Sequence, residues 1–199
     1  MARQPHLTPA ERAAIFDDAN WRGGPCFELR LRASPGQEHA LAHTLLHDQS
    51  VVLQLPISPE DQPEDQMDGL HTSVDVALRL DGLPAMGFRA IGLHSAYVEL
   101  VTYPLMVERT CGLSADDQDQ PVGPNGLLLY RGLASLAARI HTAVCPLRAE
   151  ISWEAFFADS PLADGLILPK DVAALLNVRA DAVDSSFASV SWQNVRPLA

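Results

Sequence analysis

Three histidines, His39, His43 and His47, recur every fourth residue in a segment whose composition predicts a helix. At 100° per residue they share one side of that helix, away from its leucine-rich arc. Two histidines one turn apart can bind one metal ion. The three together extend about 12 Å along the axis, so a single ion needs another ligand, such as Glu28, Asp48 or a loop carboxylate. The pattern predicts either a metal site at His39 and His43 or an ordinary polar helix face.

The three cysteines, Cys26, Cys111 and Cys145, are odd in number and far apart, which indicates reduced thiols rather than disulfides or a zinc knuckle. His141 and Cys145 lie four residues apart near the end of a predicted helix. The negative end of a helix dipole disfavours the thiolate that a nucleophile requires. We therefore expect Cys145 to be a buried apolar residue beside Pro146. Cys26 follows a Gly-Gly-Pro turn, and the sequence names no catalytic partner for it.

Paired carboxylates are the remaining catalytic pattern. Glu150 and Glu154 fall on the polar side of a predicted strand and are about 13 Å apart, which exceeds the carboxylate separation of glycosidases. Glu99 or Glu108 could approach one of them across a sheet. The simpler interpretation is a solvated sheet face whose polar side chains point outward.

Common catalytic and cofactor motifs are absent from the sequence: there is no dinucleotide or P-loop glycine pattern, no H-E-x-x-H, no G-x-S-x-G and no EF-hand loop. The acidic stretch that begins at Asp116 lacks the glycine and the final glutamate of a calcium loop. We expect no dedicated cofactor, with a divalent metal on the histidine helix as the alternative.

The elements that must position these residues are read from hydrophobic periodicity. A capping box from Thr8 to Glu11 opens the first helix, and Asp81-Gly82 predicts a two-residue hairpin turn. Helices are predicted at about 9–18, 34–48, 126–144 and 169–177. Strands are predicted at about 26–33, 51–55, 74–80, 86–93, 97–103, 105–109, 148–154 and 187–192.

This order of elements predicts a single α+β domain over residues 1–199. Its mainly antiparallel, mixed sheet is expected to be covered on one face by two longer helices. Two acidic loops, at about 56–73 and 112–126, are expected to interrupt it. Strands and helices do not alternate strictly, so a doubly wound nucleotide-binding fold is not expected.

The net charge of −11 is concentrated in the middle of the chain. Residues 60–119 hold 12 acids but only Arg79, Arg89 and Arg109 as bases. General binding to nucleic acid or to anionic membranes requires clustered basic residues, which this chain lacks. No apolar run approaches the ~18 residues of a membrane span, and no signal peptide is evident, so we expect a cytoplasmic protein.

The localised charge leads us to expect a non-catalytic binding protein that recognises a basic protein partner, for example an immunity or inhibitor protein against a bacterial toxin. The alternative is a metal-dependent enzyme that uses the His39/His43/His47 helix face, and a third reading gives the charge a role in solubility alone. Homo-oligomers remain open. The residues expected to bind the partner are acidic and lie in the two loops: Glu60, Asp61, Glu64, Asp65, Asp68, Asp116, Asp117 and Asp119.

Overall fold

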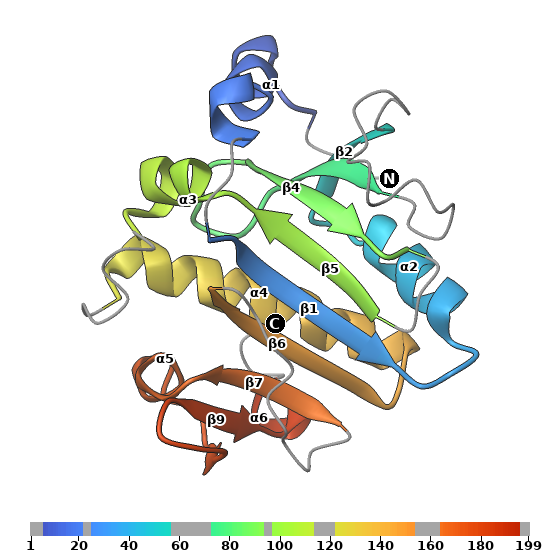
Figure 1. Cartoon of the computed structure of the whole chain (residues 1–199), viewed down its shortest axis with the longest axis vertical. Helices are drawn as coiled ribbons and strands as arrows, with labels where there is room; N and C mark the ends of the chain where they lie inside the picture. The colour runs from blue at the N-terminus through green and yellow to red at the C-terminus, as the bar shows by residue number, and fades with distance from the viewer. Residues whose placement is uncertain are drawn as a thin grey trace.

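A computed structural model of the chain describes residues 6–21, 25–56, 73–93, 97–113, 122–153 and 164–195. Within these residues nine strands form one sheet in the order β2-β3-β4-β5-β1-β6-β7-β9-β8 (Figure 1). The described strand pairs are antiparallel apart from β6 and β7, which are parallel. The strands are β1 (Phe27–Ala33), β2 (Val51–Pro56), β3 (Val74–Leu78), β4 (Met86–Ile91), β5 (Tyr97–Thr102), β6 (Leu147–Trp153), β7 (Gly165–Pro169), β8 (Asp181–Ala182) and β9 (Phe187–Val190).

The described helices divide between one long helix and several short ones. They are α1 (Pro9–Ile15), the 3₁₀ turn η1 (Asp18–Trp21), α2 (Glu38–Leu46), α3 (Pro104–Cys111), α4 (Pro124–Ala143), α5 (Lys170–Leu175) and α6 (Trp192–Val195). The fold is therefore α+β, built on one mixed sheet, as the sequence predicted. None of the helices in the described ranges is long and apolar enough to cross a membrane.

The hydrophobic core lies between the sheet and the helices α2 and α4, which run behind the sheet in Figure 1. The central strand β1 alternates in the predicted way, and its Phe27, Leu29 and Leu31 are completely buried toward these helices. In α4, Leu129, Leu133 and other apolar residues at helical spacing face the same core. Burial of this face is the main stabilising contribution to the fold.

The N-terminal segment packs on the opposite face of the sheet, at its β4 end. Thr8 forms the predicted capping box with Glu11. The indole of Trp21 lies so close to β4 that a Cβ added to Gly87 would come within 2.9 Å of it. Arg89, on the same face of β4, places its guanidinium 5.5 Å from the centre of the Trp21 ring. The lack of a side chain at Gly87 is what lets α1 and η1 approach the sheet.

The predicted strand at 105–109 is wrong, because this segment is helix α3. Pro104 occupies the first turn of the helix, where its missing N–H costs nothing. Met106, Val107 and Cys111 face the core at helical spacing. Short apolar runs fit strand and helix alike, so the proline position decides between them.

Three boundaries also differ from the predictions. Ser34 does not cap α2, since the helix starts at Glu38 after the N-cap Gln37. The hairpin of β3 and β4 exists, but Leu78 pairs with Met86, so its connection is longer than two residues. The predicted last strand ends at Val190, and Trp192 begins α6. Strand β7 was not predicted at all.

Candidate functional site

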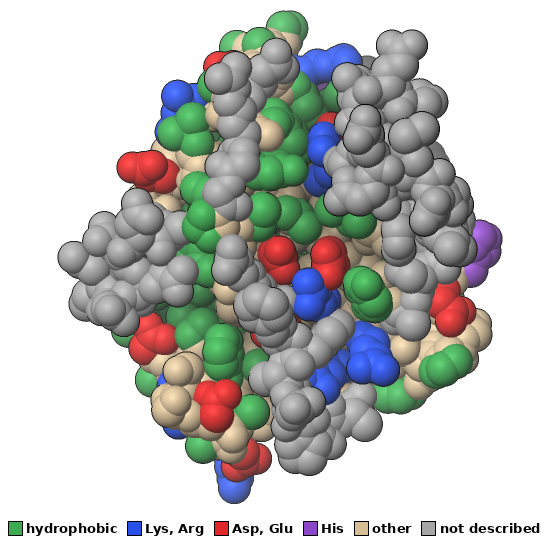
Figure 2. Space-filling model, viewed as in Figure 1, with side chains coloured by type: hydrophobic (Ala, Val, Ile, Leu, Met, Phe, Trp, Pro, Cys, Tyr) green, Lys and Arg blue, Asp and Glu red, His purple; other side chains and the backbone are tan. Residues whose placement is uncertain are grey.

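The face of the sheet opposite α2 and α4 carries a row of charged residues across three neighbouring strands. Strand pairing places Arg30 of β1 directly between Glu99 of β5 and Glu150 of β6. The Arg30 guanidinium lies 2.6 Å from a carboxylate oxygen of Glu99 and 3.5 Å from one of Glu28. We call Glu28, Arg30, Glu99 and Glu150 the sheet cluster. Figure 2 shows acidic and basic side chains gathered near the middle of this face.

The polar side of β6 is not solvated, contrary to the prediction. Glu150 is 1% exposed and Ser152, opposite Glu28 in the pairing, is 3% exposed. A buried carboxylate requires compensation from charge or hydrogen bonds. The register that puts Glu150 beside Arg30 brings such a charge to its side.

The next rows across this face carry basic residues. Arg32 of β1 pairs with Tyr97 on one side and with Arg148 on the other. Toward the β3 edge, Arg89 donates to both carboxylate oxygens of Asp75, at 2.8 and 3.3 Å. Acids and bases therefore alternate over the face, which is close to charge balance.

This geometry answers the expectation that Glu99 could approach Glu150 across the sheet. The two residues do lie in one row, separated by the strand that carries Arg30. Because neighbouring strands are about 4.8 Å apart, their backbones are roughly 10 Å apart. The arginine between them contacts Glu99, so the row forms an ion-paired arrangement across the sheet rather than an acid and base pair. Glu154 lies outside the described residues, and Glu108 is exposed on α3.

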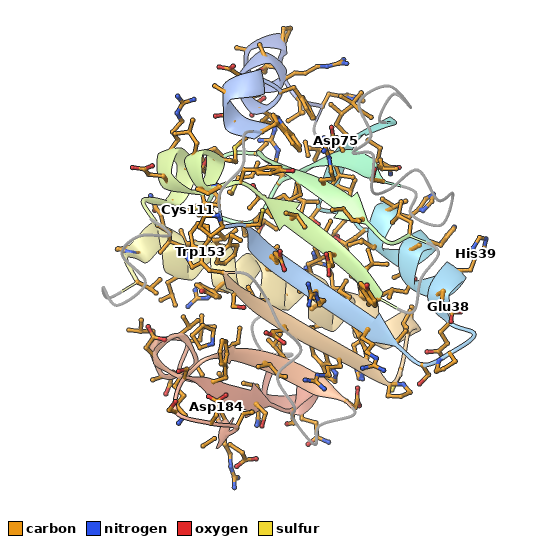
Figure 3. The ribbon with its side chains drawn as sticks, in the orientation of Figure 1. Glu38, His39, Asp75, Cys111, Trp153 and Asp184 are labelled. Carbon is orange, nitrogen blue, oxygen red and sulfur yellow. The ribbon has the colours of Figure 1, made fainter. Side chains whose placement is uncertain are left out.

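The helix histidines are exposed on α2 and at its end. Figure 3 shows His39 pointing away from the sheet, next to Glu38. The rings of His43 and His47 stack at 4.1 Å, and Nδ1 of His47 donates to the carbonyl of His43. Stacked rings direct their ring nitrogens in parallel rather than toward one point. Asp48 is engaged elsewhere, since both its carboxylate oxygens accept from Arg139 at 2.9 Å. The metal site at His39 and His43 remains a prediction without geometric support from these contacts.

The three cysteines differ in their exposure to solvent. Burial raises the pKa of the Cys111 thiol to about 12, which makes it unreactive. Cys26 is partly buried before β1. Cys145 is exposed, so the prediction that it would be a buried apolar residue is wrong. The helix ends at Ala143, and the turn to β6 carries Cys145 out to the surface.

The residues expected to bind a basic partner, Glu60, Asp61, Glu64, Asp65, Asp68, Asp116, Asp117 and Asp119, lie outside the described residues. The elements on either side of them are described. The first acidic segment (57–72) joins β2 to β3 at one edge of the sheet, and the second (114–121) joins α3 to α4. In Figure 1 these flanking elements lie on opposite sides of the molecule.

Of the four described acids in the middle of the chain, two form ion pairs within the fold, and Asp81 and Glu108 are exposed. Asp75 pairs with Arg89, and Glu99 pairs with Arg30. Arg79, from the same part of the chain, contacts Glu11 of α1 at 3.0 Å. The two acidic segments together contain eight acids and no lysine or arginine. Most of the excess negative charge therefore belongs to these segments and not to the sheet.

Comparison with protein-family models, with curated proteins and with solved structures found no match to this chain.

One cluster was missed by sequence reasoning. His141, Cys145 and Asp164 come together at the end of α4, each with a potential ligand atom within 4.8 Å of those of the other two. The spacing of His141 and Cys145 was a visible signal. Asp164 follows β6 and lies beside the cysteine only because β7 pairs with β6, and β7 was not predicted.

Proposed function

We propose that this protein is a non-catalytic, cytosolic binding protein that recognises a basic protein partner through its two acidic segments, 57–72 and 114–121. The observation that carries the proposal is their composition, with eight acids and no lysine or arginine. An immunity or inhibitor protein that neutralises a basic toxin is the functional class that fits this charge distribution.

The charge pairing within the rest of the described fold supports its role as a scaffold that carries the acidic segments. The described charged residues of the sheet pair with one another, as Arg30 does with Glu99 and Arg89 with Asp75. Such internal pairing leaves the acidic segments as the main source of negative potential. A localised potential of one sign accelerates the encounter with a partner of opposite charge and selects against other acidic proteins.

The positions of the flanking elements refine the proposal. Because β2 and β3 lie on one side of the molecule and the end of α3 and the start of α4 lie on the other, the segments do not have to act as one surface. We treat them as two binding regions that can be tested separately.

The test is capture of partners from a lysate of the source cells on immobilised full-length protein, at about 50 mM and about 500 mM salt. One variant neutralises the first segment (Glu60→Gln, Asp61→Asn, Glu64→Gln, Asp65→Asn, Asp68→Asn). A second variant neutralises the other segment (Asp116→Asn, Asp117→Asn, Asp119→Asn). Captured proteins are identified by mass spectrometry, and the dissociation constant of each purified partner is then measured.

We expect a basic protein that is released at high salt and whose affinity falls at least tenfold in one of the two variants. The matched control, Asp81→Asn with Glu108→Gln and Asp171→Asn, removes three exposed acids of the described fold and should leave the affinity unchanged. Equal capture by the wild-type protein, both segment variants and the control would overturn the proposal.

A further inference from the structure

The topology brings three metal-ligating side chains together where the neighbouring strands β6 and β7 begin. His141 lies in the last turn of α4, and Cys145 lies in the short connection from that helix to β6. Asp164 directly precedes β7, whose first residue Gly165 pairs in parallel with Arg148 of β6. Because parallel strands start at the same edge, the residues that precede β6 and β7 become neighbours.

The three side chains are close enough to share one ion. Nε2 of His141 lies 3.2 Å from Oδ1 of Asp164, and one ligand atom of each residue lies within 4.8 Å of the others. Ligands of a tetrahedral zinc ion are about 3.5 Å apart, so the exposed Cys145 has to move by roughly 1 Å. The His141 side chain is 8% exposed and that of Asp164 is 40% exposed, so the cluster is buried on one side and open to solvent on the other.

The state of His141 is the second observation that points to a ligand. Both of its ring nitrogens are buried and make no hydrogen bond, even though the Asp164 carboxylate is near. A buried imidazole in a purely structural role normally donates to a carbonyl or carboxylate. Here the ring lies against the indole of Trp192, with centroids 4.9 Å apart, so its orientation is fixed by packing.

Asp164 is held in place by groups that would support a metal ligand. Its Oδ1 accepts from the backbone N–H of Leu147 and from Nε1 of Trp192, each at 2.9 Å. Hydrogen bonds of this kind orient the carboxylates of metal sites.

We propose that His141, Cys145 and Asp164 form a zinc site. Imidazole, thiolate and carboxylate are the ligands that Zn²⁺ takes in proteins, and a thiolate disfavours Mg²⁺ and Ca²⁺. The negative end of the α4 dipole stabilises a cation at this place, and a bound zinc ion keeps the thiol deprotonated. Three protein ligands leave a fourth position, on the solvent side, for water or for an external ligand.

The test uses the full chain, freed of metal and titrated with Co²⁺, whose thiolate charge-transfer absorption reports a cobalt–sulfur bond. We expect saturation at one Co²⁺ per chain and displacement of the cobalt by Zn²⁺. Cys145→Ser should abolish the charge-transfer band. Asp164→Asn, which keeps an Oδ1 acceptor for Trp192, should weaken Co²⁺ binding at least tenfold without unfolding the protein.

Two controls separate this site from the other candidate ligands. Cys26→Ser and the double variant His39→Ala/His43→Ala should both retain the band and the affinity. Absence of a thiolate band in the wild-type protein, or a band that survives Cys145→Ser and is lost in Cys26→Ser, would overturn the proposal. Circular dichroism of each variant confirms that the fold is intact, so that loss of binding reports the ligand itself.

Discussion

Trp192 lies nearly parallel to His141, with an interplanar angle of 22° and ring centroids 4.9 Å apart. The same indole donates from Nε1 to the carbonyl of Leu147 and to the carboxylate of Asp164, each at 2.9 Å. One side chain of α6 thus contacts the end of α4, the start of β6 and the residue before β7. Trp192 is therefore one of the residues that join α6 to the rest of the described fold.

Replacement of Trp192 by Phe tests this connection. The variant keeps an aromatic ring against His141 but loses the Nε1 donor, so the Asp164 carboxylate loses one of its hydrogen bonds. We expect the free energy of unfolding to fall by about 1.5 kcal/mol, since the donor serves a charged acceptor. If the zinc site exists, the affinity for Co²⁺ should also fall about tenfold. Urea unfolding and cobalt titration measure the two effects independently, and unchanged stability would contradict the role given to Nε1.

Replacement of Arg30 by Met tests the sheet cluster. The variant fills a similar volume but removes the positive charge that contacts Glu99 and Glu28. Because the Arg30 side chain is only 20% exposed, the loss should exceed that of a surface ion pair, and we expect about 2 kcal/mol in urea unfolding. Arg131→Met, at an exposed position of α4, is the control and should change stability by less than about 0.5 kcal/mol. Equal effects of the two substitutions would mean that the cluster contributes little.

The contact of Asp48 with Arg139 predicts a pH-dependent contribution to stability. Burial raises the pKa of the Asp48 carboxyl, but hydrogen bonds from Arg139 and Ser50 outweigh it, and the pKa is held below its ordinary value. Stability from this group is therefore present above the unfolded pKa and is lost as the pH falls through the folded pKa. We expect Asp48→Asn to cost about 1.5 kcal/mol at neutral pH and the difference from wild type to shrink below about pH 4. Urea unfolding across this range measures it, and a constant difference would refute the assignment.

At Gly132 of α4, we expect substitution by alanine to cost more in packing than it gains in helix propensity. A Cβ at this position would lie 2.8 Å from Cβ of Leu80, too close for an ordinary contact. Alanine favours helix over glycine by about 1 kcal/mol, yet overpacking costs about 1–3 kcal/mol, so Gly132→Ala should destabilise the protein. Leu80→Ala keeps this Cβ but removes Cδ1 and Cγ, which would lie 3.1 and 3.2 Å from the new methyl group, so it relieves part of the crowding. In thermal unfolding the double variant should lose less stability than the two single variants combined.

The elements with a clear period could be predicted from the sequence. The alternation from Phe27 to Ala33 and the leucine stripe of α4 each correspond to a described element, because burial on one side imposes the period. The capping box at Thr8 was equally readable, since it depends only on local geometry. The type of a short segment such as α3 could not be predicted, because a short apolar run fits the period of a strand and that of a helix alike.

The candidate sites depended on contacts that local sequence does not contain. The burial of Glu150 follows from its position between strands, not from its neighbours Ala149 and Ile151. The cluster of His141, Cys145 and Asp164 required the parallel pairing of β6 with β7. A polar residue on an alternating strand was assigned to solvent because that is the usual outcome for a half-buried sheet.

The central position of β1 in the sheet has a consequence for the folding of the chain during its synthesis on the ribosome. Its two partners are β5 and β6, and Phe27 pairs with Thr102 and with Trp153, far along the chain. At roughly 5–20 residues per second, a ribosome needs on the order of ten seconds to supply the second partner. For that time a strand with one apolar face and both edges unpaired has to avoid other nascent chains, since open strand edges promote association. The strand at the centre of the finished sheet thus depends on protection until its second partner has been synthesised.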